Sequence, residues 1–346
     1  MPLTNVQVSE LFALKAMEAE GHSRKAYERA SREAMAWREE ASDLAAQDRD
    51  LTELAGIGPK LSAVLRDWFD SPPEVPEPPP ERTGFMSMAE ALRTVRANPQ
   101  WRGVLRADLQ MHTTYSDGVL GVVEMAEAAH DYGGYTHLAI TDHSAGQRIP
   151  SGMDVEAIAA QRVEIDEANQ AAGGRYRILQ GIEMNLTPTG EGDTPSEVLA
   201  RLDIVLGSFH SKLREKEDQT ARYLAAVLNP DIQVLAHPQG RMYGRRRGLN
   251  ADWEKVLGAV ALLDKAVEFD CNPNRQDLRP EILRIAADAG VRVSLGTDAH
   301  SPYELTFITY GIAALCVAGI GPERVINTMP VEELLAWVAS VREGAG

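Results

Sequence analysis

The chain has 346 residues and a formal net charge of -16, from 35 lysines and arginines against 51 aspartates and glutamates. Hydrophobic residues make up 44% and charged residues 25%, a globular composition that excludes wholesale disorder and collagen-like repeats. The acidic balance argues against a protein that coats nucleic acid or an anionic membrane with its whole surface. The two cysteines, Cys271 and Cys316, are too few for a disulfide framework and indicate a reducing compartment.

The sequence shows no export or membrane signal. Residues 1–21 lack a basic segment followed by an apolar core, so no signal peptide is expected. No uninterrupted apolar run is long enough to cross a bilayer. We therefore expect a cytoplasmic protein with no membrane partner.

The chain is expected to divide at a proline-rich segment. Residues 71–80, SPPEVPEPPP, hold six of the 19 prolines, and such a run favours an extended linker over a helix interior or a central strand. Residues 1–70 have apolar side chains at helical spacing. We expect an all-α domain over 1–70, a linker with a connecting helix over 71–99, and a second domain over 100–346.

Residues 100–346 alternate short apolar segments with amphipathic ones. The expected strands are 105–111, 137–141, 177–183, 204–208, 233–236, 266–270 and 292–295. The expected helices are 122–132, 155–172, 220–228, 252–265 and 280–289. About seven βα units predict an α/β fold with a parallel sheet, and at this length a distorted (β/α)7 barrel.

Metal-binding residue types follow nearly every expected strand. Five of the eight histidines stand just after apolar segments, namely His112, His143, His210, His237 and His300. Three carboxylates have similar positions, namely Asp117, Glu183 and Asp298. Active sites of such barrels form at the C-terminal ends of the strands, so these side chains are expected to converge. A cluster of His, Asp and Glu without cysteine predicts a site for zinc, manganese or iron.

Six motifs occur in order along the second domain. They are DLQMHTTYSDG (108–118), AITDHS (139–144), GIEMNL (181–186), GSFHS (207–211), LAHPQGR (235–241) and GTDAHSP (296–302). Together they resemble the motif series of the PHP family (polymerase and histidinol phosphatase). The resemblance implies a PHP barrel with phosphoesterase activity.

Further segments resemble the PHP domain of bacterial family X DNA polymerases. These are HPQGRMYGRRRG (237–248), NPNRQDLRP (272–280) and VINTMPVEELLAWV (325–338). LAGIGPKLSAVLRDWF (54–69) resembles the helix-hairpin-helix motif of their N-terminal domain, whose tight turn presents backbone N–H groups to a phosphate. Only about thirty residues separate the two domains here, which leaves no room for a polymerase palm. Polymerase activity is therefore not expected.

The resemblance implies a cluster of up to three divalent metal ions. The first ion would take Gln110, His112, Glu183 and Asp298. The second would take Glu183 as a bridge, with His210 and His237. The third would take Asp117, His143 and His300. Position 110 departs from the family, which most often has His there. Because an amide oxygen is a weaker donor than imidazole for zinc or manganese, we expect weaker occupancy or altered metal preference at the first site.

Arginines near these motifs are candidate phosphate ligands. Arg241, Arg245, Arg246 and Arg247 form the densest basic run and closely follow His237. Arg275 and Arg148 belong to two other loops that follow expected strands. Arg offers bidentate geometry to phosphate, which favours substrate binding over a solvated surface cluster. We expect Arg148, Arg241, Arg245, Arg246 and Arg275 to bind substrate, and Glu183, His210, Asp298 and Arg241 to act in catalysis.

The leading hypothesis is a metal-dependent hydrolase of DNA phosphoester bonds. A 3′-to-5′ exonuclease, a 3′-end processing enzyme and an abasic-site endonuclease in DNA repair all fit it, with single-stranded, 3′-end or abasic DNA as partner and no nucleotide cofactor. One alternative is a small-molecule phosphatase acting on histidinol phosphate or a nucleotide. Another is a non-catalytic DNA-binding scaffold.

Overall fold

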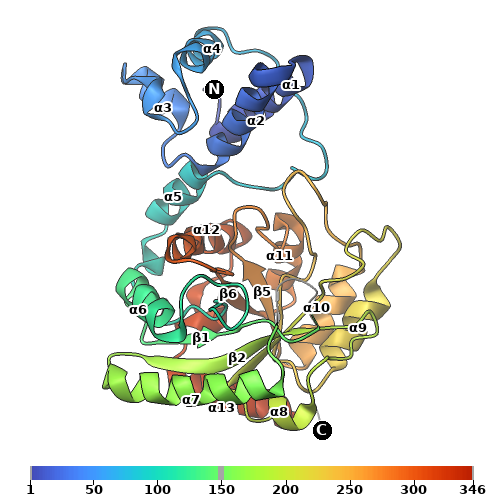
Figure 1. Cartoon of the computed structure of the whole chain (residues 1–346). Coiled ribbons are helices and arrows are strands. Elements are labelled where there is room, and N and C mark those ends of the chain that lie inside the picture. Colours follow the sequence, from blue (N-terminus) through green and yellow to red (C-terminus); the bar gives the residue numbers. More distant parts are fainter. Residues whose placement is uncertain (1, 147–151, 345–346) are drawn as a thin grey trace. The chain divides into compact units, whose positions relative to one another are not determined.

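The computed structural model describes residues 2–146 and 152–344. The chain divides into two compact units, Met1–Ala97 and Asn98–Gly346. Figure 1 shows an all-helical first unit and an α/β second unit. In the described residues, every helix is too short or too polar to span a lipid bilayer.

The first unit is a small helical bundle. Its helices are α1 (Asn5–Glu18), α2 (Gly21–Ala36), α3 (Ala41–Ala46), α4 (Pro59–Asp70) and α5 (Met88–Ala97), with a 3-10 turn at Leu51–Glu53. Val8, Phe12, Leu44 and Leu65 lie in its apolar core. The buried Asn5 joins two helix starts, because its amide donates to the carbonyl of Glu39 and accepts from the N–H of Ala41.

The second unit is built from parallel strands and covering helices. The strands are β1 (His137–Ile140), β2 (Arg177–Asn185), β3 (Ile204–Ser208), β4 (Val234–Leu235), β5 (Ala266–Asp270) and β6 (Arg292–Gly296). The helices are α6 (Val122–Gly133), α7 (Val155–Ala172), α8 (Ser196–Leu199), α9 (Thr220–Leu228), α10 (Trp253–Leu262), α11 (Pro280–Asp288), α12 (Ile308–Ala318) and α13 (Val331–Gly344). Short 3-10 turns lie at Pro99–Trp101, Pro302–Phe307, Pro322–Arg324 and Ile326–Thr328.

The six strands form one sheet in the order β1 to β6, each parallel to the next. The seventh expected strand, 105–111, is an extended segment rather than a regular strand. It lies between the two edge strands, since Ala139 of β1 donates to the carbonyl of Asp108 and Met111 bridges to Ala299 after β6. The predicted seven-membered α/β barrel is thus confirmed, with one irregular member that accounts for its distortion.

Asn327 fills the gap that this irregular member leaves. Its fully buried side chain accepts from the N–H of Leu295 and donates to the carbonyls of Leu295 and Ala107. Its own carbonyl accepts from the N–H of Arg106. One side chain therefore satisfies backbone groups of β6 and of segment 105–111 that the sheet leaves unpaired.

Apolar side chains fill the barrel at the end opposite the candidate site. Inward residues such as Leu109, Leu179 and Val234 pack with Trp337 and Val338 of α13. A second apolar cluster lies between β1 and the covering helices α6 and α7, and α7 runs alongside β2 (Figure 1). This packing fixes the strands, so the side chains at their C-terminal ends are presented on a rigid frame.

Candidate metal centre

Each candidate ligand lies near the C-terminal end of a strand or of segment 105–111. His112 follows that segment, His143 follows β1, Glu183 is in β2, His210 follows β3, His237 follows β4, and Asp298 and His300 follow β6. His237 and Asp298 have positive φ angles of 24° and 52°, which residues with side chains rarely adopt. Backbone strain of about 1–3 kcal/mol at such positions is typical of functional sites.

Glu183 lies at the centre of the cluster. Its Oε1 is 2.7 Å from Nε2 of His237 and 2.9 Å from Nε2 of His210. Its Oε2 is 3.1 Å from Nδ1 of His143 and 3.5 Å from Nε2 of His112. The structure thus surrounds one fully buried carboxylate with four imidazoles, and both of its oxygens face potential metal ligands.

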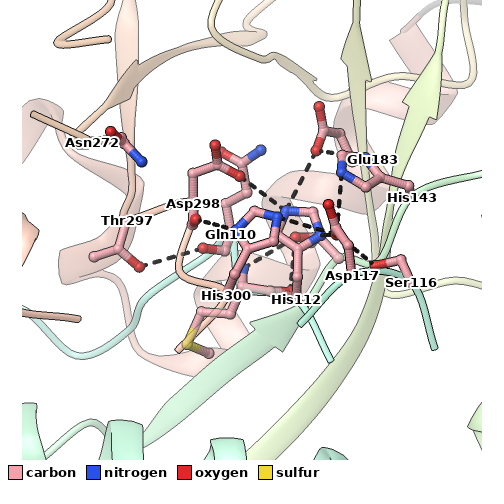
Figure 2. A network of polar contacts seen from close by, with 12 residues as sticks. Gln110, His112, Ser116, Asp117, His143, Glu183, Asn272, Thr297, Asp298 and His300 are labelled. Carbon is pink, nitrogen blue, oxygen red and sulfur yellow. Dashed lines mark hydrogen bonds and ion pairs between the residues drawn. The ribbon is translucent and has the colours of Figure 1, made fainter. Parts of the chain in front are cut away.

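Asp117 gathers a second group of imidazoles. Its Oδ1 lies 3.1 Å from Nε2 of His300, 3.5 Å from Nε2 of His143 and 3.9 Å from Nδ1 of His112 (Figure 2). Nδ1 of His300 lies 2.7 Å from the carbonyl oxygen of Asp298. That contact fixes the ring with Nε2 toward Asp117, as expected of a metal-binding histidine.

A third group joins His112, Glu183 and Asp298. Oδ1 of Asp298 lies 3.0 Å from Nε2 of His112. Gln110 is fully buried beside this group, and neither Oε1 nor Nε2 has a hydrogen-bond partner among the described residues. A side chain at Gly296 would collide with Glu268 and come within 2.7 Å of Oε1 of Gln110, so only glycine leaves room for both groups.

The carboxylates and imidazoles of this cluster shift one another's pKa values. Burial opposes ionisation of Glu183, but His143, His237 and His210 outweigh it and hold the pKa of Glu183 well below its usual range. Burial also opposes the charged form of His143, yet Glu183 raises the pKa of that imidazole to about 9. Against burial, the hydrogen bond to Asp117 and the charge of Asp298 raise the pKa of His300 to about 10.

The residues present fit a metal cluster. Within the part of the chain that the structure describes, several buried polar atoms have no hydrogen-bond partner: Nδ1 of His112, Nδ1 of His237 and both amide atoms of Gln110. Leaving buried polar groups unpaired costs about 1–3 kcal/mol each, so a native site needs another partner for them. Three sets of three or four ligand atoms lie close enough together to hold one ion each.

Asp142 supports the cluster without joining it. Its carboxylate accepts from the N–H and hydroxyl of Thr113 at 2.7 and 2.6 Å, from Ser116 at 2.5 Å and from Gln161 at 2.7 Å. These contacts fix the loop that carries His112 and Asp117. With its oxygens so occupied, Asp142 is a positioning residue and not a candidate ligand.

The sequence did not single out two further buried carboxylates, Glu268 and Asp270. Both are fully buried in β5, the one strand for which no ligand was predicted, with Asp270 at its C-terminal end. Oε2 of Glu268 accepts from the N–H of His237 at 2.8 Å. Burial, and then the charge of Asp270, raises the pKa of Glu268 well above its usual range. Burial, and then the charge of Asp298, does the same to the pKa of Asp270. The position of Asp270 at a strand end, shared with the predicted ligands, is the signal that could have identified it, whereas Glu268 lies in the middle of the strand.

The candidate arginines have different surroundings. Nε of Arg275 lies 3.1 Å from Asp270 and 3.4 Å from Asp298, so this arginine contacts the cluster. Arg246 is half-buried beside His210, and Arg245 is exposed. The side chain of Arg241 is withdrawn from solvent, because this residue is only 1% exposed, and its backbone N–H donates to Asp277. Arg148 lies outside the described residues.

The predicted hairpin of the first unit has a tight turn. Gly56 has a φ of 81°, Gly58 precedes α4, and Pro59 opens that helix. A Cβ at Gly56 would come within 2.9 Å of Glu33, so the turn requires glycine. Phosphate binding at this turn stays a prediction.

The part of the chain that carries this cluster is similar to known proteins. A family model described as "PHP domain" matches residues 108–267, which carry most of the candidate ligands. The chain is also 31% identical over 208 residues to a protein of Acetivibrio thermocellus named "Probable phosphatase", covering 57% of this chain and 80% of that one. The chain belongs to the PHP family. It is thereby placed among the PHP-type hydrolases of phosphoester bonds.

Two further proteins are similar to parts of this chain. The chain is 34% identical over 268 residues to the "DNA polymerase/3'-5' exonuclease PolX" of Bacillus subtilis, covering 77% of this chain and 45% of that protein. It thus spans less than half of that relative. A crystal structure of histidinol phosphate phosphatase from Lactococcus lactis with zinc, L-histidinol and phosphate matches 62% of this chain and 94% of its own, at 17% identity and a TM-score of 0.47.

Proposed function

We propose that this PHP protein hydrolyses phosphoester bonds of DNA, as a 3′-to-5′ exonuclease, a 3′-end processing enzyme or an abasic-site endonuclease. The observation that carries the proposal is the convergence of four histidines on Glu183, with Arg275 at its edge. A carboxylate surrounded by several imidazoles is a ligand set for divalent ions that act on phosphate esters. Arg275 adds a cation that can bind phosphate.

Up to three manganese, zinc or iron ions would be held by the residues already described. The first would use Gln110, His112, Glu183 and Asp298, the second Glu183, His210 and His237, and the third Asp117, His143 and His300. When bound, such ions supply Lewis acidity that activates water near neutral pH and offsets negative charge on the phosphate.

The protein side chains orient these groups and balance their charge. Nδ1 of His210 lies 3.4 Å from both Ser208 and Asn185, which directs Nε2 toward Glu183. Glu183 contacts His112, His143, His210 and His237, which are candidate ligands of all three ions. Arg275 offsets the charge of Asp298 and is proposed to bind a substrate phosphate oxygen, with Arg246 further along the substrate. Because Arg241 is buried, it suits a role in supporting the loop 241–247 rather than direct contact with substrate.

DNA is favoured over a small monoester for two reasons. The arginines at positions 245, 246 and 275 extend beyond the cluster, which suits a backbone carrying more than one phosphate. The similarity to PolX, named a DNA polymerase/3'-5' exonuclease, covers more of this chain than the similarity to the probable phosphatase of Acetivibrio. The free cysteines, Cys271 and Cys316, fit a cytoplasmic location.

A small-molecule phosphatase is the second candidate, because two relatives of which this chain covers 93% and 80% are named probable phosphatases. One substrate panel separates the two. Purified protein with Mn²⁺ is given a labelled single-stranded oligonucleotide, an abasic duplex and histidinol phosphate. Turnover of either DNA supports our proposal. Turnover of histidinol phosphate alone would establish the phosphatase, and no turnover of any of them would favour a scaffold.

A further inference from the structure

A cationic pocket lies beside the metal centre. It has a volume of about 320 Å³ and is lined by His210, Lys212, Leu213, Arg214, Glu215 and Arg246. Because His210 is a candidate metal ligand, the pocket and the metal centre share a wall. Three of the lining residues are cations and one is a carboxylate, so the pocket is positive within an acidic chain.

The three cations are not neutralised by the protein. Within residues 2–146 and 152–344, Lys212, Arg214 and Arg246 form no ion pair with a carboxylate within 4.0 Å. Nε of Arg246 is buried without a hydrogen-bond partner. Burial lowers the pKa of Arg246, and the charges of Arg275 and then Arg214 lower it further. Arg246 is thus close to the positive charges of Arg214 in the pocket and of Arg275, which contacts Asp298.

The loop that carries this pocket is fixed before any ligand arrives. Lys212 has a φ of 53°, an uncommon backbone conformation for a residue with a side chain. Arg222 holds the loop from beneath, because its guanidinium donates to the carbonyl of Ser211 at 2.8 Å and lies 4.0 Å above the ring of Phe209. Preformed walls reduce the entropy lost on binding, which is typical of a recognition site.

We propose, on the basis of the DNA function above, that Lys212, Arg214 and Arg246 bind a second phosphate of the substrate, a backbone phosphate adjacent to the ester that is hydrolysed. Lysine and arginine are the residues that recognise phosphate, and a polyanion is the ligand that needs several of them together. A small phosphodiester has no second phosphate to occupy the pocket. The pocket therefore selects nucleic-acid chains over small phosphate esters.

The test compares two substrates in the Mn²⁺-loaded full chain. Lys212→Gln and Arg214→Gln change exposed side chains and leave the fold intact. The kcat/KM for a single-stranded oligonucleotide is divided by that for bis(p-nitrophenyl) phosphate. We expect this ratio to fall about tenfold in each variant. The slope of log kcat/KM against log salt for the oligonucleotide should also flatten by about 0.7 for each charge removed.

Arg177→Gln is the matched control, because Arg177 is an exposed arginine at the opposite end of β2. It should leave the substrate ratio unchanged. An unchanged ratio in the Lys212 and Arg214 variants, while the parent protein digests the oligonucleotide, would overturn the subsite alone. A parent protein that hydrolyses bis(p-nitrophenyl) phosphate but no oligonucleotide would overturn the DNA function, and the subsite with it.

Discussion

Nε of Arg275 lies 3.4 Å from Oδ2 of Asp298, so an arginine directly contacts a candidate metal ligand. Burial disfavours the ionised form of Asp298, but Arg275 and then His112 outweigh burial and hold the pKa of Asp298 well below its usual range. The arginine thus keeps Asp298 charged and ready to bind a cation, while it remains near the place where substrate phosphate would bind.

Arg275→Met should remove this charge and a phosphate contact together. We expect kcat/KM for bis(p-nitrophenyl) phosphate to fall at least about tenfold, which corresponds to ~1.4 kcal/mol of transition-state stabilisation. Arg275→Lys keeps a charge without the planar fork and should recover part of the loss. Steady-state kinetics of the three proteins check this, and equal rates in the Met variant and the parent would exclude both roles.

Gln110 should limit the first metal site. Three proteins form a series at this position. Gln110→Leu offers no donor atom, the parent offers an amide oxygen, and Gln110→His offers an imidazole, the stronger ligand for zinc and manganese. We expect the metal retained per chain after gel filtration to rise along this series. Elemental analysis by mass spectrometry measures it directly, without reference to activity. The same metal content in all three proteins would show that position 110 is not a ligand.

The sequence predicted the candidate ligands because they follow one rule of parallel barrels. His112, His143, His210 and His237 stand just after apolar segments, and the carboxyl ends of those segments meet in space. Five of the helices and six of the strands were predicted for the same reason, since their apolar periodicity is strong. Contacts between residues that are far apart in the sequence cannot be predicted in this way.

Three features show what the local pattern leaves out. Segment 105–111 has a strand-like sequence, but its pairing is irregular and completed by Asn327, which is remote in sequence. Glu268 looks like any strand residue until β5 is placed beside His237. The burial of Arg241 depends on the packing of its loop, so it could not be predicted from the basic run 241–247.

Asn327→Ala should destabilise the barrel. The change leaves the N–H of Leu295 and two buried carbonyls without their partners, at about 1–3 kcal/mol for each lost contact. We expect the free energy of unfolding to fall by roughly 3–4 kcal/mol, the lower end of the sum of these three losses. Urea denaturation measures it, with Asn250→Ala at an exposed position as control. A loss no larger than that of the control would contradict the assigned role of Asn327.

His137 should make stability depend on pH. Burial, followed by the charge of Arg106, lowers the pKa of the fully buried His137 to about 4. Between pH 6.5 and 4 the unfolded chain binds a proton that the folded chain does not, so stability falls as pH falls through this window. The loss reaches about 3 kcal/mol.

The measurement is urea denaturation at pH 7, 5.5 and 4.5 for the parent and for His137→Gln. The Gln variant removes the titrating group and should show a smaller loss between pH 7 and 4.5. Identical pH dependence in the two proteins would show that His137 does not contribute. His137 starts β1, at the end of the barrel away from the ligands, so metal loading does not enter the comparison.

The most direct test of the central claim is a time course of a labelled single-stranded oligonucleotide with Mn²⁺, using the parent protein and Glu183→Gln purified identically. Glu183 faces four histidines, so its loss should disable the whole cluster. We predict that the parent digests the oligonucleotide, that EDTA stops it, and that the variant is at least about 1,000-fold slower, or ~4 kcal/mol. An inert parent, or a variant as active as the parent, would contradict a DNA phosphoesterase built around Glu183.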